Sequence, residues 1–219
     1  MSHNTIALLG NPNCGKTTLF NGLTGANQRV GNWPGVTVDR KEGSYRYGEK
    51  TVKVVDLPGI YAIDAEEDGS SIDEAIARDY LLAGEAQVVV DIVDASNLER
   101  NLYLTTQILE MGVPLVVALN MTDVAADQGT RVNPKLLAER LGCPVIPMVA
   151  SRNDGVEALQ QCLDDLLEMP SLPQAKVVYP SLIEEALTAL TPAVAASHPT
   201  ARDRWTALKL LEYDDATAP

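Results

Sequence analysis

The stretch GNPNCGKTT, residues 10–18, has the residue types and spacing that point most directly to chemistry. It fits the pattern G-x-x-x-x-G-K-[ST], in which backbone N–H groups and the positive end of the following helix face phosphate oxygens. Lys16 supplies a cation for the β- and γ-phosphates, and the Thr17 hydroxyl suits Mg²⁺. The residues predicted to contact a nucleotide here are Gly10, Asn11, Pro12, Asn13, Cys14, Gly15, Lys16, Thr17 and Thr18.

A second group of residues, DLPG at positions 56–59, ends a predicted strand. The Asp56 carboxylate can hold Mg²⁺ through a water molecule, as aspartates in Walker-B positions do. The Gly59 N–H can reach a γ-phosphate. The sequence therefore predicts that Asp56, Leu57, Pro58 and Gly59 contact the nucleotide or its metal ion.

The loop NMTD, residues 120–123, indicates a preference for guanine. The Asp123 carboxylate can accept hydrogen bonds from guanine N1–H and the 2-amino group, which adenine lacks. Asn120 would tie this loop back to the phosphate loop. Met121 occupies a position where Lys is commoner, so its side chain would cover the base without carrying a charge. How strongly the site prefers GTP over ATP is therefore left open.

A fourth loop, Val149-Ala150-Ser151, ends the last predicted strand. The Ala150 N–H could bind guanine O6. This loop alone is not distinctive, and it supports guanine-nucleotide binding only together with the other three motifs.

These four motifs, in this order, resemble those of the TRAFAC class of GTPases, which have a Ras-like core. The resemblance covers residues 5–167. It implies that Thr37 is the switch I threonine that binds Mg²⁺ and the γ-phosphate, with Gly35 and Val36 also at the nucleotide. Ile60 occupies the position where Ras-like enzymes place a water-orienting glutamine.

Other GTPases that lack this glutamine and carry PN before xGK use a K⁺ ion beside the phosphates. That resemblance implies that Asn13 supplies a side-chain ligand, and that Gly31 and Trp33 supply backbone carbonyls. The catalytic residues would then be Asn13, Lys16, Thr37 and Gly59. The alternative is that Asn13 only stabilises a turn, as Asn often does.

The segment RVGNWPGVTVD, residues 29–39, resembles switch I of the ferrous iron transporter B family, which takes up Fe²⁺ in bacteria. DLPGIY at 56–61, NMTD at 120–123 and RWTALKLLE at 204–212 are also similar to that family. The resemblance implies an N-terminal G domain, then a small helical domain that slows GDP release, then a membrane region. The short helical segment in this chain leaves its role in GDP release open.

The same resemblance implies GTP/GDP, Mg²⁺ and K⁺ as cofactors, and slow, K⁺-stimulated GTP hydrolysis coupled to Fe²⁺ uptake. The implied partners are guanine nucleotide, a membrane transport region of the same polypeptide outside this chain, and small accessory iron-transport proteins. The expected location is the cytoplasmic face of the bacterial inner membrane. The oligomeric state stays open.

Alternating apolar runs and helix-length segments indicate an α/β fold with a mostly parallel sheet and flanking helices. Six strands are predicted, at residues 5–10, 40–47, 51–56, 87–94, 114–120 and 144–150. Helices are predicted at 16–25, 72–82, 98–111, 134–141 and 156–167. Prolines in 169–180 indicate a linker, so we expect a G domain over 1–168 and a helical subdomain, incomplete, over 181–219.

The composition of the chain disfavours some classes of function. The 219 residues carry a formal net charge of −13, which disfavours binding to nucleic-acid backbones. No apolar run approaches the ~20 residues that span a bilayer. Two alternatives remain. A ribosome-assembly or tRNA-modification GTPase should carry a basic appendage, and a nucleotide switch with negligible turnover is favoured by the missing glutamine.

Three side expectations concern the loops. Trp33 could pack in the core, but its glycine and proline neighbours favour an exposed position or one over the nucleotide. The acidic segment 64–74 is expected to be a solvated switch II with a helix start at Ser71. Cys14 is expected to be a plain loop residue, with a redox-sensitive thiol as the alternative.

Overall fold

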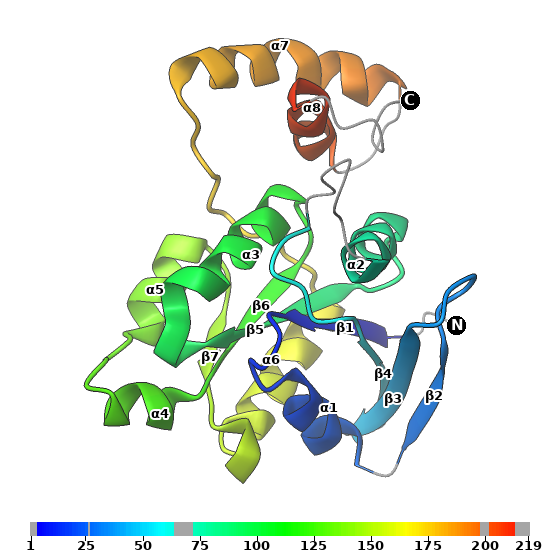
Figure 1. The fold of residues 1–219 in the computed structure, drawn as a ribbon, viewed down its shortest axis with the longest axis vertical. Coiled ribbons are helices and arrows are strands. Elements are labelled where there is room, and N and C mark those ends of the chain that lie inside the picture. Colours follow the sequence, from blue (N-terminus) through cyan, green and yellow to red (C-terminus); the bar gives the residue numbers. More distant parts are fainter. Residues whose placement is uncertain (1–3, 26, 64–71, 198–201, 213–219) are drawn as a thin grey trace.

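The structure is a computed structural model that describes residues 4–25, 27–63, 72–197 and 202–212 (Figure 1). The predicted acidic loop falls largely in residues 64–71, outside the described residues. None of the helices in the described ranges is long and apolar enough to cross a bilayer.

A seven-stranded sheet runs through the described part of the chain, in the order β2-β3-β4-β1-β5-β6-β7. The pairs β2–β3 and β3–β4 are antiparallel, and all other neighbours are parallel. The strands are β1 (Asn4–Gly10), β2 (Gln28–Asn32), β3 (Asp39–Tyr47), β4 (Lys50–Asp56), β5 (Val88–Asp94), β6 (Leu115–Asn120) and β7 (Val145–Pro147).

Helices cover both faces of this sheet (Figure 1). The α-helices are α1 (Lys16–Thr24), α2 (Ile72–Ala83), α3 (Leu98–Glu110), α4 (Thr122–Asp127), α5 (Pro134–Leu141), α6 (Val156–Glu168), α7 (Ser181–Ser197) and α8 (Asp203–Leu211), with 3-10 turns η1 (Ala95–Asn97) and η2 (Ala150–Arg152).

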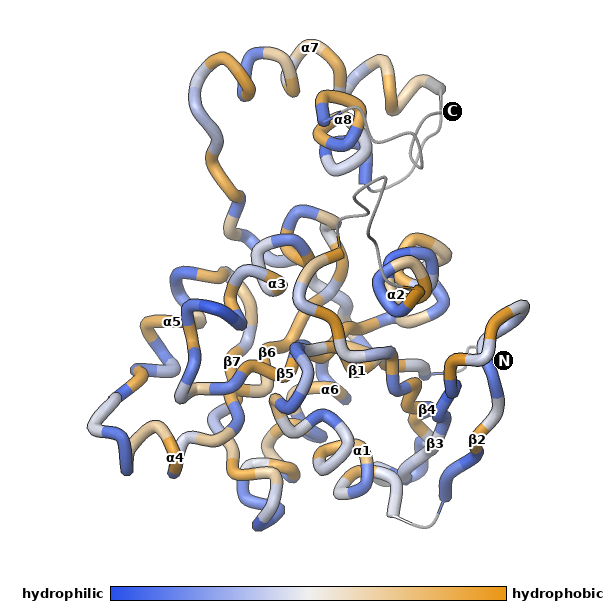
Figure 2. Tube along the Cα trace, in the orientation of Figure 1, coloured by the Kyte–Doolittle hydropathy of each residue, from blue (hydrophilic) through white to orange (hydrophobic). Residues whose placement is uncertain are grey.

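Central strand β5 shows why the sheet is covered on both sides. Val89 and Val93 belong to the core cluster that also includes residues of α2, α3 and α5, whereas Val88, Val90 and Ile92 belong to the cluster that includes residues of α1 and α6. A continuous apolar run is what a parallel strand buried on both faces requires. Figure 2 shows the contrast between apolar β5 and the hydrophilic residues along β3. The parallel strands bring their carboxyl ends, where the motifs lie, to one edge of the sheet.

The predicted α/β fold with a mostly parallel sheet is confirmed, but the strand count and some ends were wrong. Strand β2 was missed because its five residues are all exposed and give no apolar alternation. It exists through antiparallel pairing with β3. The strand predicted at 144–150 ends at Pro147, and the short helix α4 was not predicted.

Helices α7 and α8 pack against each other at one end of the molecule (Figure 1), around Leu187 and Leu208. Arg204 on α8 donates to both carboxylate oxygens of Glu184 on α7, at 2.8 and 3.1 Å. Trp205 is buried in the same core cluster as α2 and α3. The C-terminal helices therefore contact the sheet's helical layer through α8.

Asp91 is a buried carboxyl group in the middle of β5. It is 1% exposed, and the Thr105 hydroxyl of α3 donates to its Oδ2 at 2.6 Å. Burial raises the pKa of Asp91 from 3.8 to about 7, and the Thr105 hydrogen bond only partly opposes this. The folded chain therefore holds this proton more tightly than the unfolded chain between pH 4 and 7.

The raised pKa of Asp91 predicts that this group's contribution to the free energy of unfolding falls as pH rises from 4 to 7, and stays lower above that window. Asp91→Asn removes the charge and keeps an acceptor for Thr105. We expect it to stabilise the chain by about 1–3 kcal/mol at pH 8 and to flatten the pH dependence. Urea unfolding at pH 5 and pH 8 measures this, with the exposed Asp127→Asn as control. An unchanged pH slope in Asp91→Asn would contradict the assignment.

Candidate nucleotide-binding site

The loop between β1 and α1 has a backbone that only a few residue types adopt easily. Asn13 has φ 68°, and Gly15 has φ 94° at the N-cap of α1. A Cβ atom on Gly15 would lie 2.3 Å from Nδ2 of Asn120. A left-handed φ and the close approach of Asn120 both require glycine at position 15.

Asn120, at the end of β6, holds two of the motif loops together. Its Nδ2 donates to the Cys14 carbonyl at 2.9 Å, and its Oδ1 accepts from the Ala150 N–H at 2.9 Å. The predicted tie to the phosphate loop is thus present. The Ala150 N–H, predicted to bind guanine O6, is donated to Asn120 in this structure, so a contact to the base would have to share or replace that bond.

One cavity of about 440 Å³ lies beside the phosphate loop. It gathers predicted residues from three separate segments: Lys16, Thr17, Thr37, Asp56, Leu57, Pro58 and Gly59. Val38, Asp39, Lys41 and Asp73 also line it and were not predicted. The other predicted residues lie outside its lining, in the rest of the phosphate loop, in the loop after β2 and in the two base loops.

Lys16 and Asp56 form an ion pair inside this cavity. Lys16 Nζ lies 2.5 Å from Asp56 Oδ1, and the two side chains are 12% and 5% exposed. Parallel pairing of β4 with β1 brings Asp56 beside Leu8, next to the start of the phosphate loop. The predicted phosphate ligand and the predicted Mg²⁺ ligand therefore neutralise each other here.

The DLPG loop also contacts the phosphate loop through its backbone. The Leu57 N–H donates to the Leu8 carbonyl at 3.0 Å, and the Ile60 N–H donates to the Gly10 carbonyl at 3.3 Å. A Cβ on Gly59 would lie 3.4 Å from the Cα of Pro12. The DLPG loop and the phosphate loop are therefore in direct contact.

Two residues of α3 hold the chain that follows DLPG, and sequence reasoning missed both. Gln107 Oε1 accepts from the Ile63 N–H at 2.8 Å, and the Arg100 guanidinium lies 4.1 Å from the Tyr61 ring centroid. No motif marks Gln107 or Arg100, because their roles depend on packing between segments about 40 residues apart.

Trp33 lies in the core, whereas the sequence favoured an exposed position or one over the nucleotide. Its side chain is 6% exposed and packs edge-on against Tyr80 of α2, with ring centroids 5.5 Å apart. The glycine and proline neighbours suggested an exposed loop. Burial of the large apolar surface of the indole is favourable, however, and outweighs this local preference. The tertiary contact with α2 decided its position.

The three groups implied for K⁺ are not gathered in the cavity. Gly31 pairs with Arg40 in the β2–β3 ladder, and the Trp33 carbonyl accepts from the Val36 N–H at 3.3 Å. Asn13, Gly31 and Trp33 do not line the cavity. The assignment of these three residues to a K⁺ site therefore stays a prediction.

The base loop places Asp123 in the first turn of α4. Its Oδ1 accepts from the Val124 N–H at 2.9 Å, and its Oδ2 lies 3.3 Å from Nη2 of Arg152. Arg152 is 71% exposed, so this pair is a weak surface ion pair and can be exchanged for another partner. Met121 has φ 59°, and its Cε would lie 3.8 Å from a Cβ on Gly15, so its side chain reaches the phosphate loop.

Cys14 lies in the loop between β1 and α1 and is buried. Its side chain is 1% exposed, and burial, together with the charge of Asp91, raises the pKa of its thiol to about 12. A thiol in this state is a poor nucleophile at neutral pH, which argues against the redox alternative.

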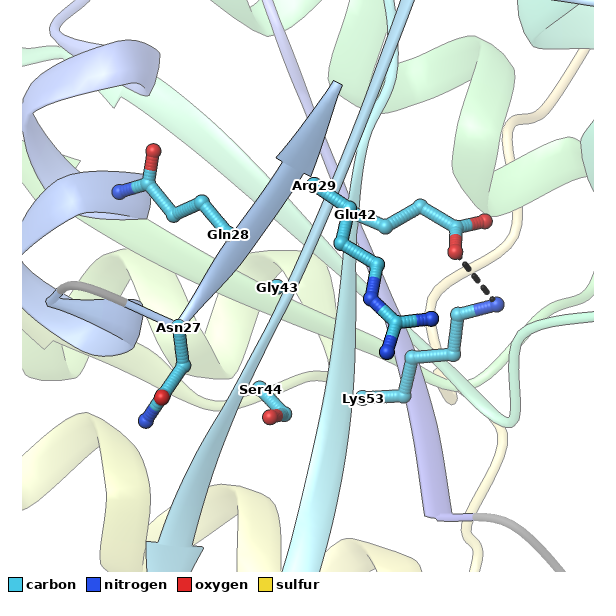
Figure 3. A pocket seen from close by; sticks show the side chains of 7 residues that line it. All are labelled: Asn27, Gln28, Arg29, Glu42, Gly43, Ser44 and Lys53. Atoms are coloured by element: carbon cyan, nitrogen blue, oxygen red, sulfur yellow. Dashed lines mark ion pairs between the residues drawn. The ribbon is translucent and has the colours of Figure 1, made fainter. Parts of the chain in front are cut away.

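A second cavity of about 440 Å³ lies at the antiparallel edge of the sheet (Figure 3). It is lined by Asn27, Gln28, Arg29, Glu42, Gly43, Ser44 and Lys53, and Lys53 Nζ lies 3.0 Å from Glu42 Oε2. None of the predicted site residues lines it. The cavity at the phosphate loop is therefore the candidate site.

Comparisons with known proteins identify the family of this chain. The family model described as "Ferrous iron transport protein B" matches residues 4–163, and the "FeoB cytosolic helical domain" model matches residues 179–218. Curated relatives named Fe(2+) transporter FeoB, from Salmonella typhi and Escherichia coli K12, are 49% identical over 210 residues. The match covers 96% of this chain but only 27% of those proteins, so this chain spans about a quarter of their length.

Solved structures are similar across nearly the whole chain. The cytosolic domain of L. pneumophila FeoB is 41% identical with a TM-score of 0.89, covering 96% of this chain and 90% of that one. An S. thermophilus NFeoB mutant bound to GDP is 42% identical, with a TM-score of 0.89 and coverage of 98% and 80%. The T. maritima FeoB cytosolic domain in its GMPPNP form is 36% identical, with a TM-score of 0.86 and coverage of 97% and 82%. The chain therefore belongs to the ferrous iron transport protein B family.

Proposed function

We propose that this chain binds GTP and GDP at the turn between β1 and α1 and hydrolyses GTP to GDP and phosphate. The observation that carries the proposal is the single cavity that gathers Lys16, Thr17, Thr37, Asp56 and Gly59. Similar chains with GDP or GMPPNP bound support the choice of nucleotide.

The donor set of the cavity suits a Mg²⁺ ion. Thr17 and Thr37 offer hydroxyl oxygens and Asp56 a carboxylate, and Mg²⁺ prefers oxygen ligands together with substrate phosphates. When bound, the metal ion would offset negative charge that develops on the phosphates. Asp56 Oδ1 is engaged by Lys16 in this structure, and we propose that nucleotide binding redirects the lysine to the phosphates and leaves the carboxylate to hold the ion through water.

The base is proposed to lie between the two loops that Asn120 connects. Asp123 would accept hydrogen bonds from guanine in place of its contact with Arg152. Met121 and the segment Val149, Ala150 and Ser151 would contact the base from either side. The Met121 side chain provides apolar cover without a charge.

Hydrolysis is proposed to be slow and stimulated by K⁺. Ile60 replaces the water-orienting glutamine, so the unassisted rate belongs near the Ras regime of ~10⁻⁴–10⁻³ s⁻¹. Asn13 would supply one K⁺ ligand after the loop that carries Gly31 and Trp33 rearranges. A cation held there would stabilise negative charge that develops in the transition state.

The whole protein is proposed to couple this nucleotide cycle to Fe²⁺ uptake. The remaining three quarters of its relatives' length leaves room for a membrane transport region, which would place this chain at the cytoplasmic face of the inner membrane. Small accessory iron-transport proteins are further proposed partners. We assign residues 1–168 to the G domain, 169–180 to a linker and 181–219 to an incomplete helical subdomain.

The alternatives are less well supported. The chain belongs to an iron transport family, and its charge of −13 opposes the RNA-binding role of ribosome-assembly and tRNA-modification GTPases. A switch with negligible turnover stays the second candidate, because Ile60 cannot orient water.

Lys16→Ala is expected to lower the affinity for a GTP analogue by at least about 100-fold, since it removes the cation that faces the phosphates. Isothermal titration calorimetry with the analogue and Mg²⁺ measures this. Lys135→Ala, at an exposed position of α5, should bind as the parent chain does. Equal affinity in Lys16→Ala and the parent would refute the loop assignment.

Asn13→Ala is expected to abolish the difference between GTP hydrolysis in K⁺ and in Na⁺, and to change GDP affinity by less than about threefold. Phosphate release in matched KCl and NaCl buffers measures the difference. Asn133→Ala, at the N-cap of α5, is the control. If the Asn13→Ala variant is still stimulated by K⁺, Asn13 is not a K⁺ ligand. Equal, near-zero rates in both salts for the parent chain would favour the switch.

Asp123→Asn is expected to weaken GTP binding by about 5- to 100-fold and to improve binding of xanthosine triphosphate, because Asn can donate to the xanthine 2-oxygen. Competition against a fluorescent GDP measures both affinities, and Asp127→Asn is the control. GTP selectivity equal to that of the parent would count against the contact.

A further inference from the structure

Asp56 has a single partner in the cavity beside the phosphate loop. Lys16 Nζ lies 2.5 Å from its Oδ1, and no other hydrogen bond or ion pair reaches its carboxylate from the residues that the structure describes. The Asp56 side chain is only 5% exposed, so water hydrates little of it. An unpaired carboxylate at this depth is strongly unfavourable. A nucleotide that draws Lys16 to its phosphates therefore leaves Asp56 in need of another positive charge.

Lys41 of β3 is placed to supply that charge. It lies directly opposite Asp56 in the antiparallel ladder between β3 and β4. Residues paired in this way point to the same face of the sheet, with Cβ atoms about 5 Å apart. Both residues line the same cavity, and the long, flexible stem of a lysine lets its ammonium group reach a neighbour at that separation.

The ammonium group of Lys41 is not engaged in the conformation described. It makes no hydrogen bond or ion pair with any residue in the described part of the chain. The two lysines of the neighbouring strand β4 differ in this respect, because Lys50 pairs with Asp164 and Lys53 pairs with Glu42. Lys41 can therefore move to Asp56 without breaking an existing contact.

Two other carboxylates line the cavity and could compete for Lys41. Asp39 precedes it on the same face of β3, and Asp73 lies in the first turn of α2. Asp39 is exposed and Asp73 is half-buried, so water hydrates both better than it hydrates Asp56. Once Lys16 has left, Asp56 is thus the carboxylate that gains most from a contact with Lys41.

We propose that Lys41 is a positioning residue that pairs with Asp56 when Lys16 leaves it for a nucleotide that carries no Mg²⁺. When Mg²⁺ is bound, Asp56 already has a positive charge beside it and does not need Lys41. Lys41 thus allows GDP to bind whether or not a metal ion accompanies it. This inference rests on the proposed function, because it requires that a guanine nucleotide draws Lys16 away from Asp56.

The affinity for GDP with and without Mg²⁺ tests this exchange of partners. Lys41→Met keeps a side chain of similar length and removes the charge. We expect it to weaken GDP binding about five- to fiftyfold in a buffer that contains EDTA, but by less than about threefold with Mg²⁺. Competition against a fluorescent GDP measures both affinities. Lys41→Arg keeps the positive charge and should stay within about threefold of the parent chain in both buffers.

The matched control is Lys135→Met, which removes a lysine charge at an exposed position of α5. It should bind GDP as the parent chain does in both buffers. If Lys41→Met and the parent chain show the same ratio of affinities with and without Mg²⁺, the inference is refuted and the proposed function stands. If the parent chain binds GDP in neither buffer, the proposed function fails and the inference fails with it.

Asp56→Asn separates a contact with Asp56 from a direct contact with the phosphates. In this background no buried charge is left behind when Lys16 moves. Adding Lys41→Met should therefore change GDP affinity in EDTA by less than about threefold. A loss that is as large in the Asp56→Asn background as in the parent chain, and equal with Mg²⁺, would mean that Lys41 contacts the nucleotide itself, and would overturn the proposal.

Discussion

The ion pair between Lys16 and Asp56 is the interaction on which the site depends. Two opposite charges, each largely removed from water, lie at the start of α1 and at the end of β4. Leaving either one unpaired at this depth would be strongly unfavourable. A ligand that brings both an anion for the lysine and a cation for the aspartate can separate the pair without leaving a buried charge, and a triphosphate with Mg²⁺ has that composition.

The rest of the fold serves to place this pair and the loops around it. Parallel strands bring the phosphate, DLPG and base loops to one edge, and the Asn120 side chain fixes two of them at 2.9 Å each. The antiparallel extension of β2 and β3 places Thr37 at the same cavity. Parallel strands thus end at the base loops, while the cavity beside the phosphate loop borders the turn after β2, in which Trp33 is buried.

The sequence was sufficient for contacts between recognisable motifs and insufficient for those set by packing alone. The hydrogen bond from Asn120 to Cys14 could be predicted because both residues stand in motifs at the ends of parallel strands. The hydrogen bond from Ile63 to Gln107 could not, since neither residue stands in a motif. Trp33 was misplaced because local composition favoured an exposed loop, whereas burial against α2 decided the outcome.

The most direct test of the central claim is a crystal structure of this chain with a non-hydrolysable GTP analogue and Mg²⁺. The account predicts that Lys16 Nζ leaves Asp56 and contacts the β- and γ-phosphates, with the metal ion between Asp56 and the Thr17 hydroxyl. An analogue bound while Lys16 and Asp56 remain paired, or bound away from the turn after β1, would contradict it.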